Sequence, residues 1–392
     1  HRTNNEEGSP AENPGCHRTR KAPTGSPAGA FLILMQGNGN TDMNMPLNTE
    51  LTDQTAESLA LHRHEVSLPT PAELKQEIPA SDFVIRQVGE QRQAIRRTLR
   101  GNDARTLIVM GPCSIHDEVA ALEYGEKLKT LADAVSDRFL IVMRAYLEKP
   151  RTTIGWKGLL YDPERTGAGD LNEGLRRSRR LLLNLAVMGL PLATEALSPF
   201  AMDYLGDLVS WTAIGARTTE SQTHREMVSG LPMPTGFKNG TDGGSAVATN
   251  AMKSASHPHH HMGVSATGAP VMITTRGNPD THLVLRGGRG ITNYDADNIE
   301  RAVSALAQAG LSTSVMVDCS HDNACKQPER QLDIAREVMA QRRAGNSHIR
   351  GLMLESFLEP GRQDDGEDLR YGCSITDPCL GWGQTEALLH SL

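Results

Sequence analysis

The sequence predicts an α/β protein of the (β/α)8, or TIM, barrel class, and three observations support this prediction. Eight short apolar runs recur between residues 106 and 354, and segments with helical spacing of apolar residues separate them. A short polar motif directly follows each apolar run. Because active sites of such barrels are built at the carboxyl ends of the strands, this placement predicts a functional site at one end of the barrel.

The eight apolar runs are expected to be strands because each is short and bounded by polar or glycine-containing segments. They cover residues 106–110, 140–143, 190–194, 208–214, 233–237, 282–285, 314–317 and 351–354. The predicted helices include residues 117–135, 171–188, 295–309, 327–343 and 384–392. This alternation is typical of a parallel sheet with helical crossovers.

The N-terminal part of the chain differs in composition from the remainder. Residues 1–40 are rich in Gly, Pro, Asn, Ser and Arg without apolar periodicity. We therefore expect residues 1–60 to be a disordered or non-native tail, with Met43 or Met45 as the natural start. Residues 61–105 are expected to form an arm and a helix, ahead of a barrel over 106–392. The order Thr70, Pro71, Glu73 predicts a capped helix start.

Composition excludes several classes of protein. The 392 residues carry a formal charge of -7 without a long basic patch, which argues against binding to nucleic acid or an anionic membrane. The sequence contains no apolar run of the roughly 20 residues needed to span a bilayer. The six cysteines form no CxxC pair, which fits reduced thiols. We therefore expect a soluble cytoplasmic protein.

Six cations stand at or just beyond the predicted strand ends. They are Arg144, Lys149, Arg151, Arg217, Lys238 and Arg286. A charged loop is often only solvated surface, so the stretch 144–153 alone does not establish binding. Six cations at one barrel mouth nevertheless exceed what one carboxylate or phosphate requires. The substrates are therefore multiply anionic, or there are two of them.

A second set of strand-end residues suits a metal ion. Cys113, His321, Glu355 and a nearby Asp would supply thiolate, imidazole and carboxylate ligands for Mn, Fe, Co or Zn. Taken singly, Cys113 is more often a small buried hydrophobe and His321 an ordinary loop histidine, but their placement at strand ends favours the metal site. The histidine-rich segment 257–261 is interpreted as structural, because adjacent strand residues point to opposite faces.

Five longer motifs carry a resemblance to a known family. They are Gly-Pro-Cys-Ser-Ile-His-Asp at 111–117 and the segments 144–157, 215–222, 236–243 and 374–382. From about residue 65 to the end, the chain resembles the class I (microbial, type I alpha) 3-deoxy-D-arabino-heptulosonate 7-phosphate (DAHP) synthases. The resemblance implies condensation of phosphoenolpyruvate with erythrose 4-phosphate, the first step of the shikimate pathway to aromatic amino acids. It also implies a divalent metal and no organic cofactor.

The resemblance implies roles for individual residues. The metal ligands would be Cys113, His321, Glu355 and Asp377. The phosphoenolpyruvate site would comprise Arg144 and Lys149 at the carboxylate region, Arg217, Lys238 and Arg286 at the phosphate, and Glu195 acting through solvent. Arg151 and Thr152 would bind the phosphate of erythrose 4-phosphate. Lys149, Glu195, Cys113 and His321 would be catalytic, and Lys149, Glu195 and metal-bound water are the candidates for moving protons.

The resemblance also implies an inserted β-hairpin at about 257–276, near an effector site for an aromatic amino acid, and a homodimer or homotetramer. Pro232 stands where family members of known sensitivity often carry Ser or Gly, so Tyr, Phe, Trp and loss of regulation all stay open. One alternative is the sister barrel, 3-deoxy-D-manno-octulosonate 8-phosphate synthase, which uses arabinose 5-phosphate. The other is a non-catalytic phosphosugar-binding regulatory barrel, which the complete set of ligands and cations argues against.

Overall fold

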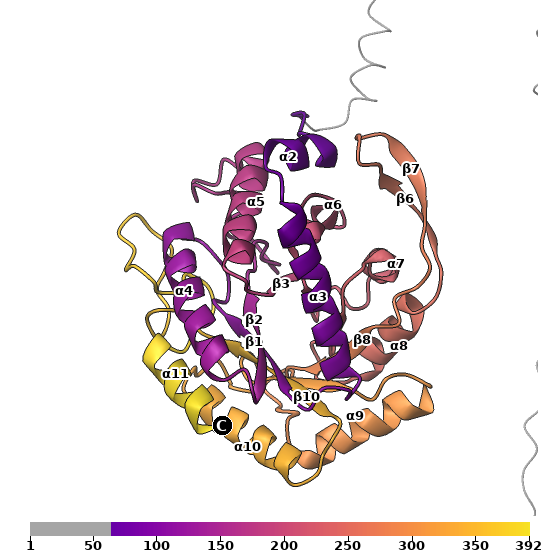
Figure 1. Cartoon of the computed structure of the whole chain (residues 1–392), viewed down its shortest axis with the longest axis vertical. Coiled ribbons are helices and arrows are strands. Elements are labelled where there is room, and N and C mark those ends of the chain that lie inside the picture. The colour runs from indigo at the N-terminus through magenta and orange to yellow at the C-terminus, as the bar shows by residue number, and fades with distance from the viewer. Residues whose placement is uncertain (1–63) are drawn as a thin grey trace, which may run out of the picture. The chain divides into compact units, whose positions relative to one another are not determined.

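The computed structural model describes residues 64–392, and the elements below lie in one compact unit, Val66–Leu392. Eight parallel strands close into a barrel in the order β1-β10-β9-β8-β5-β4-β3-β2 (Figure 1). They are β1 (Thr106–Gly111), β2 (Phe139–Arg144), β3 (Leu192–Glu195), β4 (Trp211–Ile214), β5 (Thr235–Lys238), β8 (Thr281–Leu285), β9 (Val315–Asp318) and β10 (Ile349–Glu355). The predicted fold class is thereby confirmed. The predicted tail, with its starts at Met43 or Met45, lies outside the described residues.

All eight predicted strands are present, with differences at their ends. The largest concerns β4, which begins at Trp211 instead of residue 208. The short helix α6 (Ala201–Leu205) is followed by a 3-10 turn, η1 (Gly206–Leu208). Leu208, the first residue of the predicted strand, therefore belongs to this turn. Apolar character alone does not distinguish these two conformations.

Helices surround the barrel (Figure 1). They are α4 (Glu118–Ala134), α5 (Leu171–Val187), α7 (Gln222–Gly230), α8 (Ala246–Ala255), α9 (Ala296–Gln308), α10 (Arg330–Arg343) and α11 (Trp382–Ser391), preceded by α2 (Pro71–Glu77) and α3 (Asp82–Leu99). The predicted cap of α2 is present, since the Glu73 N–H donates to Thr70 Oγ1 at 3.2 Å and the Thr70 N–H donates to Glu73 Oε2 at 2.7 Å. In the described part of the chain, no helix is long and apolar enough to cross a bilayer.

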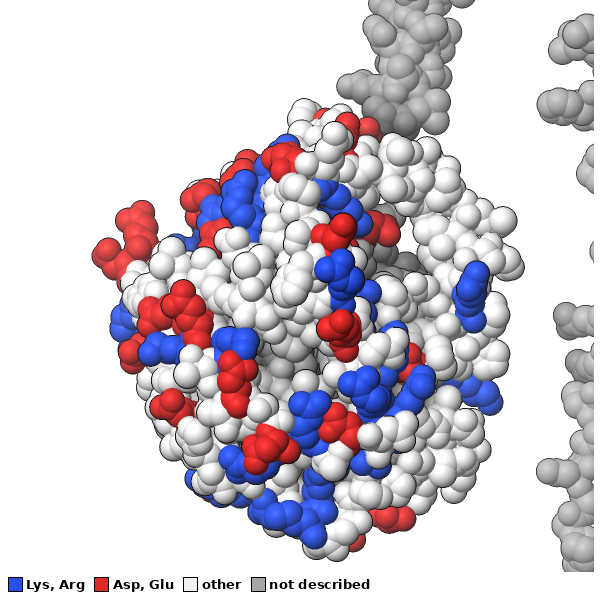
Figure 2. Space-filling view, viewed as in Figure 1, with Lys and Arg blue, Asp and Glu red and all other residues white. Residues whose placement is uncertain are grey.

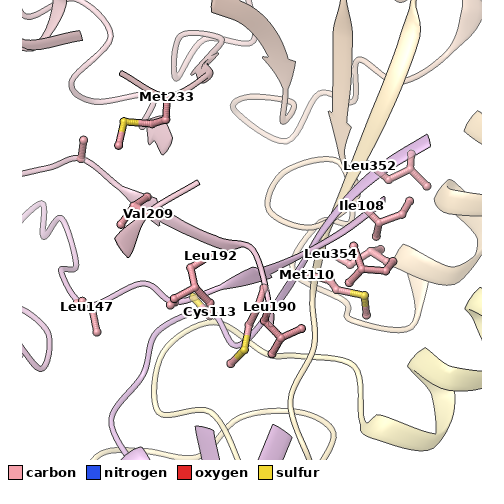
Figure 3. Close-up of a cluster of buried hydrophobic side chains, with 14 of the residues drawn as sticks. Ile108, Met110, Cys113, Leu147, Leu190, Leu192, Val209, Met233, Leu352 and Leu354 are labelled. Atoms are coloured by element: carbon pink, nitrogen blue, oxygen red, sulfur yellow. The ribbon is translucent and has the colours of Figure 1, made fainter. Parts of the chain in front are cut away.

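The strands bury both faces because successive side chains point alternately inward and outward. In β1, Leu107 and Val109 belong to the cluster inside the barrel, whereas Ile108 and Met110 pack against the helices. Figure 3 shows part of the outer cluster, including Ile108 and Met110. Both faces of each strand are thus committed to packing, which leaves the strand ends for polar chemistry.

Helix α3 closes the amino end of the barrel. Its residues Ile95 and Leu99 belong to the cluster inside the barrel, and Arg96 Nε donates to Asp280 Oδ2 at 2.5 Å, just before β8. The charged side chains on the face drawn in Figure 2 are interspersed by sign.

The predicted hairpin is present as β6 (His260–Val264) and β7 (Pro270–Thr274), paired antiparallel. Its turn contacts α2, since the Ala72 N–H donates to the Ala266 carbonyl at 2.9 Å. The histidines of this segment have separate partners: His259 Nε2 lies 2.8 Å from the Ser254 carbonyl and His260 Nδ1 lies 3.0 Å from Thr274 Oγ1. These contacts agree with the structural interpretation.

Candidate active site

A cavity of about 510 Å³ lies at the carboxyl ends of the barrel strands. Ten of the twelve predicted site residues line it: Lys149, Arg151, Thr152, Glu195, Arg217, Lys238, Arg286, His321, Glu355 and Asp377. The other two, Cys113 and Arg144, are fully buried and do not line it. Residues spread over more than 200 positions thus meet because parallel strands of a barrel all end at the same rim.

Three of the four predicted metal ligands form a compact group. The ligand atoms of Cys113, Glu355 and Asp377 all lie within 4.8 Å of one another, and Cys113 Sγ is 3.7 Å from Asp377 Oδ2. His321 lies outside this group but close to it, with Nε2 at 3.7 Å from Glu355 Oε1. A sulfur, two carboxylates and an adjacent imidazole form a donor set that fits a borderline divalent ion.

The electrostatics of the trio also fit a cation. Burial, with a contribution from Glu355, raises the pKa of the Cys113 thiol to about 11, although Lys149 Nζ lies only 2.7 Å from the sulfur. Burial opposes ionisation of Asp377 as well, but Lys149 and His321 together lower the pKa of that carboxyl. A thiolate at Cys113 therefore needs more positive charge than the protein side chains supply, which a divalent ion would provide.

The backbone and a buried carboxylate orient His321. This residue has φ of 53°, in the left-handed region that non-glycine residues seldom adopt. Its Nδ1 lies 2.9 Å from Asp318 Oδ2 and 2.7 Å from Ser320 Oγ. Such a partner on one ring nitrogen fixes the tautomer and turns the other nitrogen, here Nε2, toward Glu355.

Asp318 contacts two of the predicted site residues, Lys238 and His321, although the predicted site did not include it. It is fully buried at the end of β9 and also accepts a bond from Lys238 Nζ at 3.0 Å. Burial opposes the charge of this carboxylate, but His321 and Lys238 together hold its pKa well below the usual value. Asp318 is the last residue of the apolar strand β9, and Ser320 and His321 follow it closely in the sequence. This position at a strand end was the signal that could have identified it.

Gln331 was also missed. Its Nε2 donates to the Glu355 carbonyl at 3.1 Å, and its Oε1 accepts from the Glu355 N–H at 2.8 Å, so it fixes the end of β10. The sequence offered no signal for this role, because a glutamine in an amphipathic helix resembles any surface residue.

Arg144 supports the site from beneath. Its guanidinium donates to the carbonyls of Pro112 and Cys113 at 3.3 and 3.4 Å and to Glu355 Oε1 at 3.2 Å, and it lies 3.9 Å from the ring centroid of Tyr146. In this position it holds the loop that carries Cys113 and the carboxylate of Glu355 together.

The remaining predicted residues differ in how firmly they are held. Arg286 Nη1 pairs with Asp322 Oδ2 at 2.9 Å, and Arg151 Nε donates to the Trp156 carbonyl at 2.7 Å. Arg217 is exposed at the cavity rim. Glu195 lines the cavity, and its Oε1 is buried without a hydrogen-bond partner in the described structure.

Together, the barrel, the cation-lined cavity and the mixed thiol and carboxylate group define a (β/α)8-barrel enzyme site for anionic substrates and a divalent metal. A family model described as the DAHP synthetase I family matches residues 77–390. The chain therefore belongs to the DAHP synthetase I family, which confirms the resemblance and the expected DAHP synthase activity.

Similar proteins agree with this assignment. The Tyr-sensitive phospho-2-dehydro-3-deoxyheptonate aldolase of Escherichia coli (strain K12) is 50% identical over 331 residues, covering 84% of this chain and 93% of that protein. The Phe-sensitive protein of the same organism is 48% identical over 324 residues, covering 82% and 92% of the two chains. The solved structure of the phospho-2-dehydro-3-deoxyheptonate aldolase from Francisella tularensis SCHU S4 has a TM-score of 0.82 and 41% identity, and the match covers 84% of this chain and 97% of that chain.

Proposed function

We propose that this cavity condenses phosphoenolpyruvate with D-erythrose 4-phosphate and water to give DAHP and inorganic phosphate. One observation carries the proposal: five of the six predicted cations line a single cavity together with Glu355 and Asp377, and the third member of the metal-competent trio, Cys113, lies directly against Asp377. Two anionic substrates explain the number of cations, and an aldehyde acceptor explains the metal ligands.

For phosphoenolpyruvate, we propose that Arg217, Lys238 and Arg286 bind the phosphate and that Arg144 and Lys149 serve the carboxylate region. The ion pairs of Lys238 with Asp318 and of Arg286 with Asp322 support this assignment, because they hold both cations in place before substrate arrives. Since Arg144 is buried, its contribution from the observed position is to hold Cys113 and Glu355.

For erythrose 4-phosphate, we propose that Arg151 and Thr152 bind the phosphate. Both are exposed at the cavity, and Arg151 uses its Nε on the Trp156 carbonyl, which leaves its two terminal nitrogens for an anion. Pro150 precedes Arg151 and restricts the backbone between the two substrate sites. This restriction would help to fix the distance between the carbons that are joined.

We propose that Cys113, Glu355 and Asp377, with His321 completing the set, hold a divalent ion chosen from Mn, Fe, Co or Zn. When bound, the ion would supply Lewis-acid polarisation of the aldehyde oxygen. Lys149 contacts Cys113 Sγ at 2.7 Å and so lies between the metal ligands and the phosphoenolpyruvate site. Its ammonium would balance negative charge that develops on either side.

The chemistry follows as three bond changes. Water adds to C2 of phosphoenolpyruvate, C3 attacks the aldehyde carbon, and the hemiketal phosphate formed at C2 expels inorganic phosphate by C–O cleavage. Glu195, a carboxylate that lines the cavity, is suited to orient the water and accept its proton. Lys149 is suited to donate a proton to the new alkoxide.

A phosphate-release assay tests this function against both alternatives. Release should require erythrose 4-phosphate, stop after chelation and return when metal is restored. Release with arabinose 5-phosphate alone would favour the octulosonate-type activity, and no release with either sugar in restored metal would favour a regulatory barrel.

We further propose that an aromatic amino acid, either Tyr, Phe or Trp, inhibits the enzyme from a second cavity of about 410 Å³. The hairpin residue Ala266 and the segment Leu231, Pro232 and Met233 line this cavity, as do Lys75 and Asp203. Lys75 and Asp203 are suited to the carboxylate and the ammonium of an amino acid, and the apolar residues to its ring. Measuring activity with each amino acid tests this, and Asp203→Asn should weaken inhibition.

We also propose a homodimer or homotetramer and a cytoplasmic location. The five cysteines in the described part of the chain are all free thiols, which supports a reducing compartment. Light scattering of the protein as it elutes from a sizing column tests the oligomeric state. Fractionation of the source cells tests the cytoplasmic location.

A further inference from the structure

The aromatic ring of Tyr146 covers one face of the Arg144 guanidinium inside the barrel. The guanidinium carbon lies 3.9 Å from the ring centroid, and Arg144 and Tyr146 are only 1% and 2% exposed. A cation is attracted to the face of an aromatic ring because the face carries partial negative charge, and the attraction is stronger where water is excluded. Tyr146 belongs to the hydrophobic cluster inside the barrel and does not line the active-site cavity.

The main chain fixes the position of Tyr146. Its carbonyl accepts from the Ile115 N–H, in the loop after β1, at 3.0 Å. The preceding residue is held as well, since the Ala145 N–H donates to the Ala193 carbonyl of β3 at 2.7 Å. The ring of Tyr146 therefore has a defined place between two segments of the barrel rim.

Arg144 has only one carboxylate partner in the described part of the chain. Its nitrogens contact two backbone carbonyls, Met353 Sδ at 3.0 Å and Glu355 Oε1 at 3.2 Å, and only the last of these groups carries a negative charge. A buried cation is costly unless its charge is compensated. The balance of the Arg144 charge therefore depends on Glu355 and on the ring of Tyr146.

Glu355 is also one of the proposed metal ligands. Its carboxylate lies within 4.8 Å of the ligand atoms of Cys113 and Asp377. A carboxylate that coordinates a divalent ion shares its negative charge with that ion, so less of this charge remains for Arg144. The ring of Tyr146 is not a metal ligand and keeps its attraction for the guanidinium. The ring therefore stabilises Arg144 most when the metal is bound.

We propose that Tyr146 is a positioning residue for the metal site, because its ring balances the charge of Arg144 when Glu355 coordinates the ion. It acts through Arg144, which contacts both the Cys113 carbonyl and the Glu355 carboxylate. Without the ring, the guanidinium would draw the Glu355 carboxylate toward itself or leave its place, and either change weakens metal binding. The inference rests on the proposed metal ligands and not on the identity of the two substrates.

Titration with Co²⁺ tests this role, because a thiolate bound to Co²⁺ gives a charge-transfer absorption band. Cys113→Ala identifies the part of the band that belongs to this sulfur. Two replacements at position 146 keep a ring of similar size: Tyr146→Phe retains the negative face, and pentafluorophenylalanine removes it. The affinity for Co²⁺ should stay within about threefold of wild type in the first variant and fall about fivefold or more in the second. Tyr146→Leu, which has no ring, should resemble the fluorinated variant.

Leu107→Ala is the matched control. Leu107 is fully buried in the same cluster inside the barrel, but it pairs with Leu140, four positions before Arg144 on β2. Its truncation leaves a cavity and lowers stability, whereas the affinity for Co²⁺ should not change. Thermal unfolding of each variant separates a loss of stability from a loss of metal binding.

Equal affinity for Co²⁺ in the Phe and pentafluorophenylalanine variants would overturn the proposal. A loss in Leu107→Ala as large as that in Tyr146→Leu would overturn it too. A wild-type protein without the Cys113-dependent band would refute the metal site and this inference together. If the wild type gives the band and the variants follow the expected order, but no phosphate is released, the inference is supported and the proposed reaction is contradicted.

Discussion

The buried carboxylate of Asp318 holds two predicted site residues at once, so its charge is expected to be essential. In Asp318→Asn the side chain keeps its shape, but Lys238 Nζ at 3.0 Å and His321 Nδ1 at 2.9 Å lose a charged partner. A hydrogen bond to a charged group contributes about 1.5–3 kcal/mol, and removing one partner of a buried pair costs about 3–5 kcal/mol. Taking about 3 kcal/mol as the loss in the transition state, kcat/KM for phosphoenolpyruvate should fall on the order of 100-fold.

The measurement is phosphate release as a function of phosphoenolpyruvate concentration at saturating metal, with metal affinity determined separately. Asp322→Asn is the matched control. Its carboxylate also pairs with one predicted phosphate ligand, Arg286, at 2.9 Å, but its side chain is 25% exposed. Partly solvated pairs contribute about 1 kcal/mol or less, so the loss should be below about tenfold. Wild-type kcat/KM in Asp318→Asn, or equal losses in both variants, would refute the reasoning.

Three further predictions concern the metal, pH and the N-terminal arm. Cys113→Ala should abolish metal-dependent turnover in a metal titration, and wild-type activity would show that this sulfur is not a required ligand. Burial lowers the pKa of His282 to about 4, so the unfolded chain takes up the proton first as pH falls. The free energy of unfolding should therefore decrease between pH of about 6.5 and about 4, by up to about 3 kcal/mol. His282→Gln, which keeps an acceptor for Trp211 Nε1, should reduce this slope in urea titrations, and an unchanged slope would contradict the assignment. Thr70→Ala should cost about 1 kcal/mol by removing the cap of α2, whereas Thr70→Ser should cost less, and equal losses would rule out the cap as the cause.

The sequence was sufficient for the barrel and for most of the cavity lining. Strands in a closed parallel barrel end on one rim, so a polar residue directly after an apolar run is placed by the topology alone. Lys238 and Arg286 were identified in this way, and both line the cavity. No knowledge of the neighbouring side chains was needed for these residues.

The parts that sequence could not supply depend on rotamers and on packing between distant elements. Arg144 and Lys149 are five positions apart and were expected to act alike, yet Lys149 lines the cavity and Arg144 is buried beneath it. The difference arises because Arg144 is the last residue of β2 and packs on Tyr146 and Met353, whereas Lys149 lies farther along the loop. The role of Gln331 could not be predicted for a similar reason, because its hydrogen-bond partner Glu355 lies 24 positions away on another element.

The ion pairs of the cavity raise the question of how Lys238 and Arg286 could also bind a substrate phosphate. Lys238 has three N–H donors and spends one on Asp318, and Arg286 has five donors in a fork of which Asp322 engages only one nitrogen. The paired carboxylates therefore fix the direction of each cation while leaving donors free, which lowers the cost of ordering them when the substrate binds. Arg217 makes no ion pair in the described part of the chain and is exposed, so on the proposed assignment the phosphate itself would order this side chain. The proposed phosphate site would therefore combine two cations that are fixed before the substrate binds, Lys238 and Arg286, with one that is ordered on binding, Arg217.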